Sequence, residues 1–299
     1  MSGAPEGTVG IAGLGLIGTA VAGRLTAAGF TLIGYDVDPA KRAAFAERGA
    51  VATDLADLWR RSGRVVVAVF DTAQVAEVLA AAGAAGPRTA VVMTTCDPDR
   101  IADIGAAATA AGTAVVEAPI SGSSGQLAGG TATILAAGAP DAVAAQADLF
   151  AAIAGRTIEV GRLGDGNRTK LAINLVLGLN RAALAEGLVL AERLGLDPAA
   201  FLEAAKGSAA YSQVMDIKGG MMVEGRFAPQ GRIVQSAKDF ALIAATGGDR
   251  LPFAALYGTL MAEAIAAGDG DLDNAAVIRA IRRRVGGEDG TEARGGGSD

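Results

Sequence analysis

The sequence predicts an α/β protein: a doubly wound parallel sheet in the N-terminal half, followed by an all-α C-terminal domain joined through a long interdomain helix. Three observations predict this fold. Runs rich in valine and alanine alternate with helical segments before residue 140, which is typical of parallel strands covered on both faces. A glycine-rich turn joins the first of these runs to the first helix. Only helical patterns follow the start of the long helix-compatible stretch 164–195.

The first strand and helix are predicted from "TVGIAGLGLIGTAVAGRL", in which Gly13, Gly15 and Gly18 separate an apolar run from a helical pattern. In a dinucleotide-binding turn the first glycine allows the tight turn, the second lets a pyrophosphate approach, and the third packs the helix on the strand. The phosphates lie on the free N–H groups of the helix N-terminus, where the helix dipole favours an anion. We therefore expect a Rossmann domain. Its cofactor contacts in this turn are assigned to Gly13, Leu14, Gly15, Leu16, Ile17 and Gly18.

The second strand, "TLIGYD" at 31–36, ends in Asp36. An acid at this strand end accepts hydrogen bonds from the hydroxyls of an adenosine ribose. The alternative makes Asp36 a cap or turn residue before the next helix. Because a carboxylate repels a 2′-phosphate, we expect NAD as the cofactor. Lys41 and Arg42 on the following helix weaken this preference, so NADP stays open as the second cofactor.

The remaining elements follow in order. Further strands are predicted at 65–70, 89–95, 113–119 and 131–138, and helices at 40–48, 73–82 and 98–111. The long helix spans ~40 Å at ~1.5 Å per residue, more than a small domain needs. Helices are then predicted at 198–206, 237–246, 253–267 and 273–284. We expect an NAD-binding domain over 1–162, a substrate and oligomerisation domain over 163–286, and a disordered Gly-rich tail over 287–299.

Composition excludes several classes of function. The net charge is −6 with no basic stripe, so we expect no nucleic-acid partner. The apolar stretches are interrupted before the length of a membrane span and no secretory signal is visible. We therefore expect no membrane and a cytoplasmic location, which the single Cys96 also fits. The chain has no histidine, which excludes imidazole catalysis and His-ligated metal; we expect no metal site.

Four motifs, covering nearly the whole chain in order, resemble the β-hydroxyacid dehydrogenase family, which includes 3-hydroxyisobutyrate dehydrogenases and tartronate semialdehyde reductases. The glycine turn is similar to the family's dinucleotide fingerprint. The stretch "EAPISGSSGQLAGGT" at 117–131 resembles its substrate signature. The stretch "GDGNRTKLAIN" at 164–174 resembles the segment that holds its catalytic lysine, and "AKDF" at 237–240 resembles its Lys-Asp motif.

The resemblance implies a role for each matching residue. Lys170 would be the catalytic lysine, and Asn174 would help to place the substrate. Thr95 would lie against the nicotinamide, and Lys238 would approach the cofactor from the second domain. The substrate carboxylate would be bound by Ser121, Gly122 and Ser123. The alternatives make Ser121 an ordinary turn residue and Lys238 an exposed lysine near a helix N-terminus.

Elementary chemistry supports Lys170 independently of the resemblance. Lys170 and Asn174 are four residues apart, so they share one face of the long helix. Hydride transfer leaves charge on the substrate oxygen, which a positioned ammonium group neutralises and protonates. In the oxidative direction the lysine must lose a proton, and burial favours the neutral amine. The alternative is a solvated lysine on an amphipathic helix, which is the usual situation for this residue type.

We therefore expect an NAD-dependent oxidoreductase that interconverts a small β-hydroxyacid and its β-semialdehyde or ketone. Departures from the family pattern at Ser123, Gln126, Ile173 and Gly231 leave the particular substrate open. The alternatives are an imine reductase-like enzyme or a broad aldehyde or ketone reductase on the same fold, and a non-catalytic dinucleotide-binding module, which is expected to lose the lysine. Phosphogluconate dehydrogenases also resemble the chain but need a longer helical domain. The apolar long helix predicts a homodimer or homotetramer.

Overall fold

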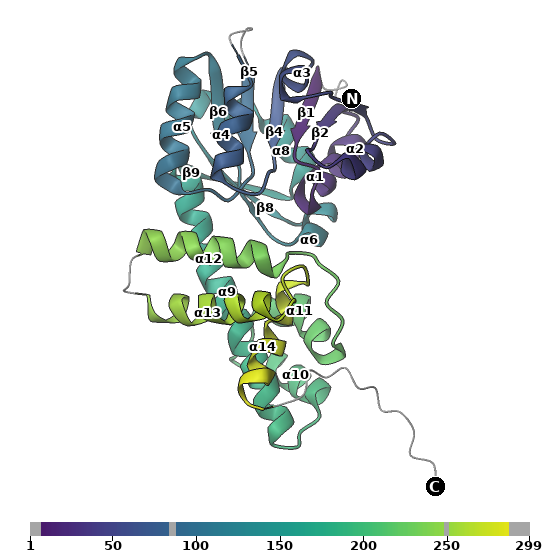
Figure 1. Cartoon of the computed structure of the whole chain (residues 1–299), viewed down its shortest axis with the longest axis vertical. Coiled ribbons are helices and arrows are strands. Elements are labelled where there is room, and N and C mark those ends of the chain that lie inside the picture. Colours follow the sequence, from purple (N-terminus) through teal and green to yellow (C-terminus); the bar gives the residue numbers. More distant parts are fainter. Residues whose placement is uncertain (1–6, 84–87, 248–250, 287–299) are drawn as a thin grey trace. The chain divides into compact units, whose positions relative to one another are not determined.

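The computed structural model describes residues 7–83, 88–247 and 251–286 (Figure 1). The predicted tail, 287–299, lies outside the described residues. Contacts between residues divide the chain into two compact units, 1–171 and 172–299. The division falls inside α9 (Asp165–Arg193), which corresponds to the long helix expected from the sequence.

Within the residues that the structure describes, the first unit is built on one nine-stranded sheet. Its strands are β1 (Thr8–Ala12), β2 (Thr31–Tyr35), β3 (Ala50–Val51), β4 (Arg64–Val67), β5 (Arg88–Val92), β6 (Thr113–Glu117), β7 (Ile120–Ser121), β8 (Thr133–Ala137) and β9 (Arg156–Gly161). They lie in the order β3-β2-β1-β4-β5-β6-β8-β7, and β9 pairs with β8. β1 pairs in parallel with both β2 and β4, and the parallel series continues through β5 and β6. The strand order therefore reverses at β1, which confirms the predicted doubly wound sheet.

The last strands depart from the predicted parallel rhythm. β8 runs antiparallel to both β6 and β7, with Ser121 opposite Thr133. Only residues 122–132 separate β7 from β8, whereas a parallel pair needs a crossover of about a dozen residues or more. The chain instead turns back through the short helix α6 (Ser124–Ala128). β9, which the sequence pattern did not predict, pairs in parallel with β8.

Helices cover both faces of the parallel strands (Figure 1). Besides α6 they are α1 (Leu16–Ala27), α2 (Pro39–Phe45), α3 (Leu55–Arg60), α4 (Thr72–Ala80), α5 (Pro98–Ala110), α7 (Pro140–Ala144) and α8 (Ala147–Ile153). Val66 of β4 belongs to the core shared with α1 and α8, whereas Val65 and Val67 belong to the core shared with α3, α4 and α5. All three valines are fully buried. Burial on both faces explains why this strand reads as a continuous apolar run.

The second unit consists of helices joined by loops. After α9 come α10 (Pro198–Lys206), α11 (Gln213–Glu224), α12 (Ile233–Gly247), α13 (Pro252–Ala266), the 3-10 turn η2 (Asn274–Ala276) and α14 (Val277–Arg284). The sequence pattern did not predict α11, because adjacent glycines at 219 and 220 interrupt it. A Cβ atom at Gly219 would lie 2.6 Å from Cδ1 of Leu202 in α10. This glycine therefore permits close packing of α10 and α11.

The length of α9 can be compared with the expectation that every apolar stretch is interrupted before it is long enough to cross a membrane. By length and composition alone α9 is long and apolar enough to do so, a test that core helices of other proteins also pass. The expectation therefore does not hold for this helix. Its side chains nevertheless include Asn167, Lys170 and Arg181, each buried by the protein itself. Buried polar side chains of this kind indicate contacts with other parts of a protein rather than with lipid.

Candidate active site

The predicted glycine turn lies between β1 and α1, where two glycines are required by their surroundings. Gly13 has a φ of 92°, which disfavours residues with a side chain, and its N–H donates to the carbonyl of Tyr35 at 2.8 Å. A Cβ atom at Gly18 would overlap the carbonyl of Gly13. α1 can therefore approach the end of β1 closely only because both residues lack side chains.

The first turn of α1 is open toward a ligand. Its N-cap residue is Gly15, which supplies no capping side chain, and a Cβ atom at Gly15 would meet nothing within 4 Å. The N–H groups of the first turn, which include those of Leu16 and Ile17, have no partner within their own helix. Backbone donors, the positive end of the helix dipole and open space at Gly15 together fit a pyrophosphate.

Asp36 follows β2 and faces this turn. Its Oδ2 accepts a hydrogen bond from the N–H of Leu14 at 2.8 Å and its Oδ1 accepts one from the N–H of Asp38 at 2.9 Å. The cap of α2 is Asp38, which accepts from the N–H of Ala40, so Asp36 is not the helix cap. The bond from the N–H of Asp38 nevertheless makes Asp36 a turn residue as well. The Nζ of Lys41 lies 3.7 Å from Oδ2 of Asp36. A fixed carboxylate beside the glycine turn fits the ribose end of a dinucleotide.

The loop after β5 carries Thr95 between two anchored neighbours. The hydroxyl of Thr94 donates to the carbonyls of Val67, the last residue of β4, at 3.3 Å and of Val69 at 3.1 Å. The N–H of Cys96 donates to Oδ1 of Asn167 in α9 at 2.7 Å. Both neighbours are buried, whereas Thr95 itself is half-buried. The loop is thus tied both to β4 and to the start of the long helix.

Glu117, the last residue of β6, holds the first turn of α9. It is fully buried, and its Oε1 accepts from the N–H of Asn167 at 3.0 Å and from Nδ2 of Asn167 at 2.6 Å. Its Oε2 accepts from the N–H of Gly164. A Cβ atom at Gly166 would lie 2.9 Å from Cβ of Glu117, so the glycine makes room for the carboxylate. Glu117, at the end of β6, therefore accepts from N–H groups at the N-terminus of α9 and so caps this helix.

Burial raises the pKa of the Glu117 carboxyl group above its ordinary value, and the hydrogen bonds from Asn167 and Gly164 partly oppose that rise. Glu117 and Asn167 lie inside two of the sequence motifs, but neither motif indicates a role for them. The available signal was an acid at the end of an otherwise apolar strand. Its partner lies fifty residues further along the chain, which a local pattern does not reveal.

Lys170 lies on α9 three residues after Asn167, so the two side chains emerge on the same face of the helix. Asn167 is fully buried and Lys170 is 8 % exposed. The solvated-lysine alternative therefore does not describe this position. Lys170 belongs to the same compact unit as the glycine turn, Asp36 and Thr95. A buried lysine on an anchored helical turn can hold or release a proton at a defined place.

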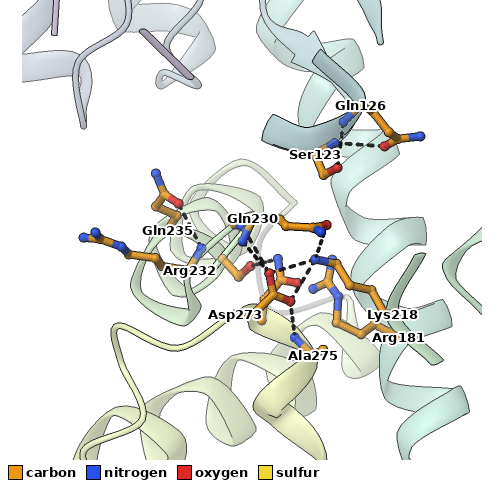
Figure 2. Close-up of polar contacts among 12 residues, drawn as sticks. Ser123, Gln126, Arg181, Lys218, Gln230, Arg232, Gln235, Asp273 and Ala275 are labelled. Carbon is orange, nitrogen blue, oxygen red and sulfur yellow. Dashed lines mark hydrogen bonds and ion pairs between the residues drawn. The ribbon is translucent and has the colours of Figure 1, made fainter. Parts of the chain in front are cut away.

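The predicted substrate loop follows β6 in the same unit. Ser121 lies in β7, and Gly122 has a φ of 143°. The hydroxyl of Ser123 accepts a hydrogen bond from the N–H of Gln126 at 3.2 Å, and the N–H of Ser123 donates to Oε1 of Gln126 at 2.9 Å (Figure 2). This reciprocal pair is a capping box for α6. Ser123 and Gln126 thus cap α6. Capping uses the Ser123 hydroxyl as an acceptor, so its O–H can still donate to a carboxylate beside Ser121 and the Gly122 backbone.

Two predicted residues, Asn174 and Lys238, lie in the second unit. Nδ2 of Asn174 donates to Oδ2 of Asp239 at 2.7 Å, and Nζ of Lys238 lies 3.1 Å from Oδ1 of the same carboxylate. Asp239 therefore brings the two residues together, a role that the motif alone did not indicate. Asn174 is one helical turn beyond Lys170 in α9. Among the described residues, no group of three or more His, Cys, Asp or Glu side chains is placed to hold a metal ion.

The open glycine turn, the acid beside it and the doubly wound sheet define a dinucleotide-binding protein. Residues 8–161 match the family model described as the NAD binding domain of 6-phosphogluconate dehydrogenase. Residues 164–281 match the model described as NAD-binding of NADP-dependent 3-hydroxyisobutyrate dehydrogenase. The chain belongs to the β-hydroxyacid dehydrogenase family and is an NAD(P)-dependent enzyme acting on CH–OH groups.

Relatives match nearly end to end. The L-threonate dehydrogenase of Cupriavidus necator is 30% identical, with 91% of this chain and 95% of the relative covered. A probable mitochondrial 3-hydroxyisobutyrate dehydrogenase-like protein of Arabidopsis thaliana is 31% identical, with coverages of 92% and 93%. The crystal structure of 3-hydroxyisobutyrate dehydrogenase from Salmonella typhimurium has a TM-score of 0.83 at 28% identity, with coverages of 91% and 99%. The imine reductase of a Pseudomonas species, at 21% identity and a TM-score of 0.63, shares the fold.

Proposed function

We propose that the protein interconverts a small β-hydroxyacid and the corresponding aldehyde or ketone, with Lys170 as the general acid and base. The observation that carries this proposal is the buried Lys170 on the turn of α9 that Glu117 holds. NAD, when bound, supplies the hydride acceptor for oxidation. Gly15 and the N-terminus of α1 would hold its phosphates, and Asp36 its ribose.

In oxidation, Nζ of Lys170 in its neutral form accepts the proton of the substrate hydroxyl. In reduction, the ammonium form stabilises the charge that develops on the carbonyl oxygen and returns the proton to it. Ser121 and the N–H of Gly122 would orient the substrate through its carboxylate. The names of the relatives support a small hydroxy or oxo acid, since they include L-threonate, 3-hydroxyisobutyrate and 2-hydroxy-3-oxopropionate.

Three further properties belong to the same proposal. The Asp36 carboxylate favours NAD over NADP, because it would face the 2′-phosphate of NADP. The exposed apolar side chains of α9, among them Val176 and Leu190, would be covered in a homodimer or homotetramer. The expected location is the cytoplasm, and small carboxylic acids are the expected partners.

The test is a screen of NADH absorbance with L-threonate, 3-hydroxyisobutyrate and 2-hydroxy-3-oxopropionate, comparing wild type with Lys170→Ala. The variant should lose at least about 10²-fold in kcat/KM, because general acid–base catalysis alone contributes about 10²–10⁴-fold. It should still bind NADH. Lys206→Ala is the matched control, since Lys206 pairs with Glu203 on α10. If Lys170→Ala keeps more than about a tenth of the wild-type rate, the assignment is wrong and Lys238 becomes the candidate.

A further inference from the structure

A second group of buried charges lies in the helical unit, away from any residue assigned above. It consists of Arg181 on α9, Lys218 on α11 and Asp273 immediately before η2 (Figure 2). Their exposed fractions are 9 %, 6 % and 0 %. Two cations and one carboxylate leave this buried cluster with one excess positive charge.

Asp273 is fully satisfied by groups other than Arg181. Both of its oxygens lie 2.8 Å from Nζ of Lys218. The same carboxylate accepts from the N–H groups of Gln230, Gly231 and Ala275 at 2.8, 3.2 and 2.9 Å. The negative charge of Asp273 is thus shared between Lys218 and three backbone donors.

Arg181, in contrast, has no acidic partner among the described residues. Its Nη1 donates to the hydroxyl oxygen of Tyr257 at 2.6 Å. Its Nε is buried without a hydrogen-bond partner. The charge of Arg181 also acts on Lys218: burial lowers the pKa of Lys218, Asp273 opposes this, and the nearby guanidinium lowers it further. A buried charge is costly unless it is paired.

The shape of the unused guanidinium edge indicates what would complete the cluster. With Nη1 directed to Tyr257, the Nε–H and Nη2–H donors remain on the other edge of the same plane. Two parallel donors in that arrangement match the two oxygens of one oxyanion. Figure 2 shows Gln230 beside Lys218, and Gln230 is half-buried, so the cluster reaches the surface of the helical unit there.

We propose that Arg181 and Lys218 form a binding site for the carboxylate of a small acid in the helical unit, with the Nε and Nη2 edge of Arg181 as its principal donor. One negative charge neutralises the excess charge of the cluster. A carboxylate supplies one, whereas a phosphate group carries about −1.5 to −2 at neutral pH. The match in charge therefore favours a carboxylate over a phosphate.

The experiment compares wild type with Arg181→Met by thermal melting and by titration calorimetry. Acetate is the probe, phosphate is the second oxyanion, and chloride at equal ionic strength is the reference. Acetate should raise the wild-type melting temperature saturably, as a ligand of the native state does. In Arg181→Met this binding should weaken about 10–100-fold, because hydrogen bonds to charged groups are lost. Phosphate should bind more weakly than acetate.

Arg282→Met is the matched control. Arg282 lies in the same unit, but Nη2 of Arg282 is 2.5 Å from Oε1 of Glu192, so its counter-charge is already present. Its loss should leave acetate binding unchanged. In chloride alone, Arg181→Met should be at least as stable as wild type, because it removes an unpaired buried charge. A purely structural Arg181 would instead make the variant less stable in every buffer.

Three results would overturn the proposal. Arg181→Met could bind acetate as tightly and with the same stoichiometry as wild type. Wild type could show no saturable response to acetate. The variant could change the oligomeric state, which would place a carboxylate of another subunit at Arg181. None of these readouts needs turnover, so failure of the proposed enzymatic reaction would be seen separately.

Discussion

Glu117→Gln tests whether a carboxylate buried at the end of β6 anchors the first turn of α9. The Glu117 oxygens accept from the N–H of Gly164 and from two donors of Asn167. A glutamine keeps one acceptor oxygen but directs an NH₂ group at the remaining donor. One buried donor is then left without an acceptor, which costs about 1–3 kcal/mol. For a chain of this size we expect a melting temperature lower by ~2–5 °C.

The difference in stability between wild type and Glu117→Gln should become smaller as the pH rises. Burial raises the pKa of Glu117 above its ordinary value of 4.5. Native protein therefore holds a proton there in a pH window where the unfolded chain has lost it. In the wild type, this proton's contribution to the free energy of unfolding is fully present below pH 4.5. It is lost as the pH rises through the pKa of Glu117 in the native protein. Glutamine does not titrate, so the deficit of Glu117→Gln should be largest in acid and should narrow as the pH rises.

The measurement is thermal and urea unfolding from pH 4 to 9, together with amide hydrogen exchange at residues 164–170. Exchange there should accelerate in Glu117→Gln, because one donor of the first turn of α9 loses its acceptor and the turn is held less firmly. Glu159→Gln, at an exposed position of β9, should change the free energy of unfolding by less than about 0.5 kcal/mol. A deficit that stays constant or grows with pH would refute the reasoning, since hydrogen bonding would then outweigh burial.

Three further predictions concern the proposed function. Asp36→Asn should improve NADPH binding relative to NADH about tenfold in fluorescence titrations, because Lys41 would then face the 2′-phosphate without the carboxylate. Asp38→Asn is the control, and an unchanged ratio of the two affinities in Asp36→Asn would contradict the role of Asp36. A substrate acid should be turned over at least about tenfold better than its amide, through charge-assisted hydrogen bonds to Ser121 and Gly122; equal turnover would show that the carboxylate is not recognised. Light scattering should give a dimer or tetramer at micromolar concentration, and a monomeric mass would exclude burial of the α9 face between subunits.

The local sequence pattern predicts the fold well where a residue type at a given spacing has only one structural explanation. The glycine spacing and the doubly buried valines were sufficient for β1, α1 and the parallel strands. The direction of β8 was missed, because an apolar run is the same in either orientation and only the short connection before it carries the information. β9 was missed because much of it is exposed at the sheet edge. α11 was missed because Gly219 breaks a helical pattern in order to fit Leu202.

The residues of the candidate site could likewise be predicted where their partners lie close in the sequence, and could not where the partners are distant. Gly13, Gly18 and Asp36 could be placed from spacing, since their neighbours lie close in the sequence. The contact between Glu117 and Asn167 could not, because the partners are fifty residues apart and each is an ordinary member of its motif. Arg181 likewise reads as one polar position on a long helix, and only its burial beside Lys218 gives it significance.

The position of the unit boundary inside α9 has a consequence for dissecting this protein. A fragment ending at residue 171 would retain only the first turns of α9, too short to persist on helical propensity alone. A fragment starting at 172 would begin in mid-helix, with four unsatisfied N–H groups and no Glu117 to accept from any of them. Excision or exchange of either half at this boundary would also cut between Lys170 and Asn174. Chimeras with relatives should therefore be joined before Gly164 or after Arg193, so that the whole helix comes from one parent.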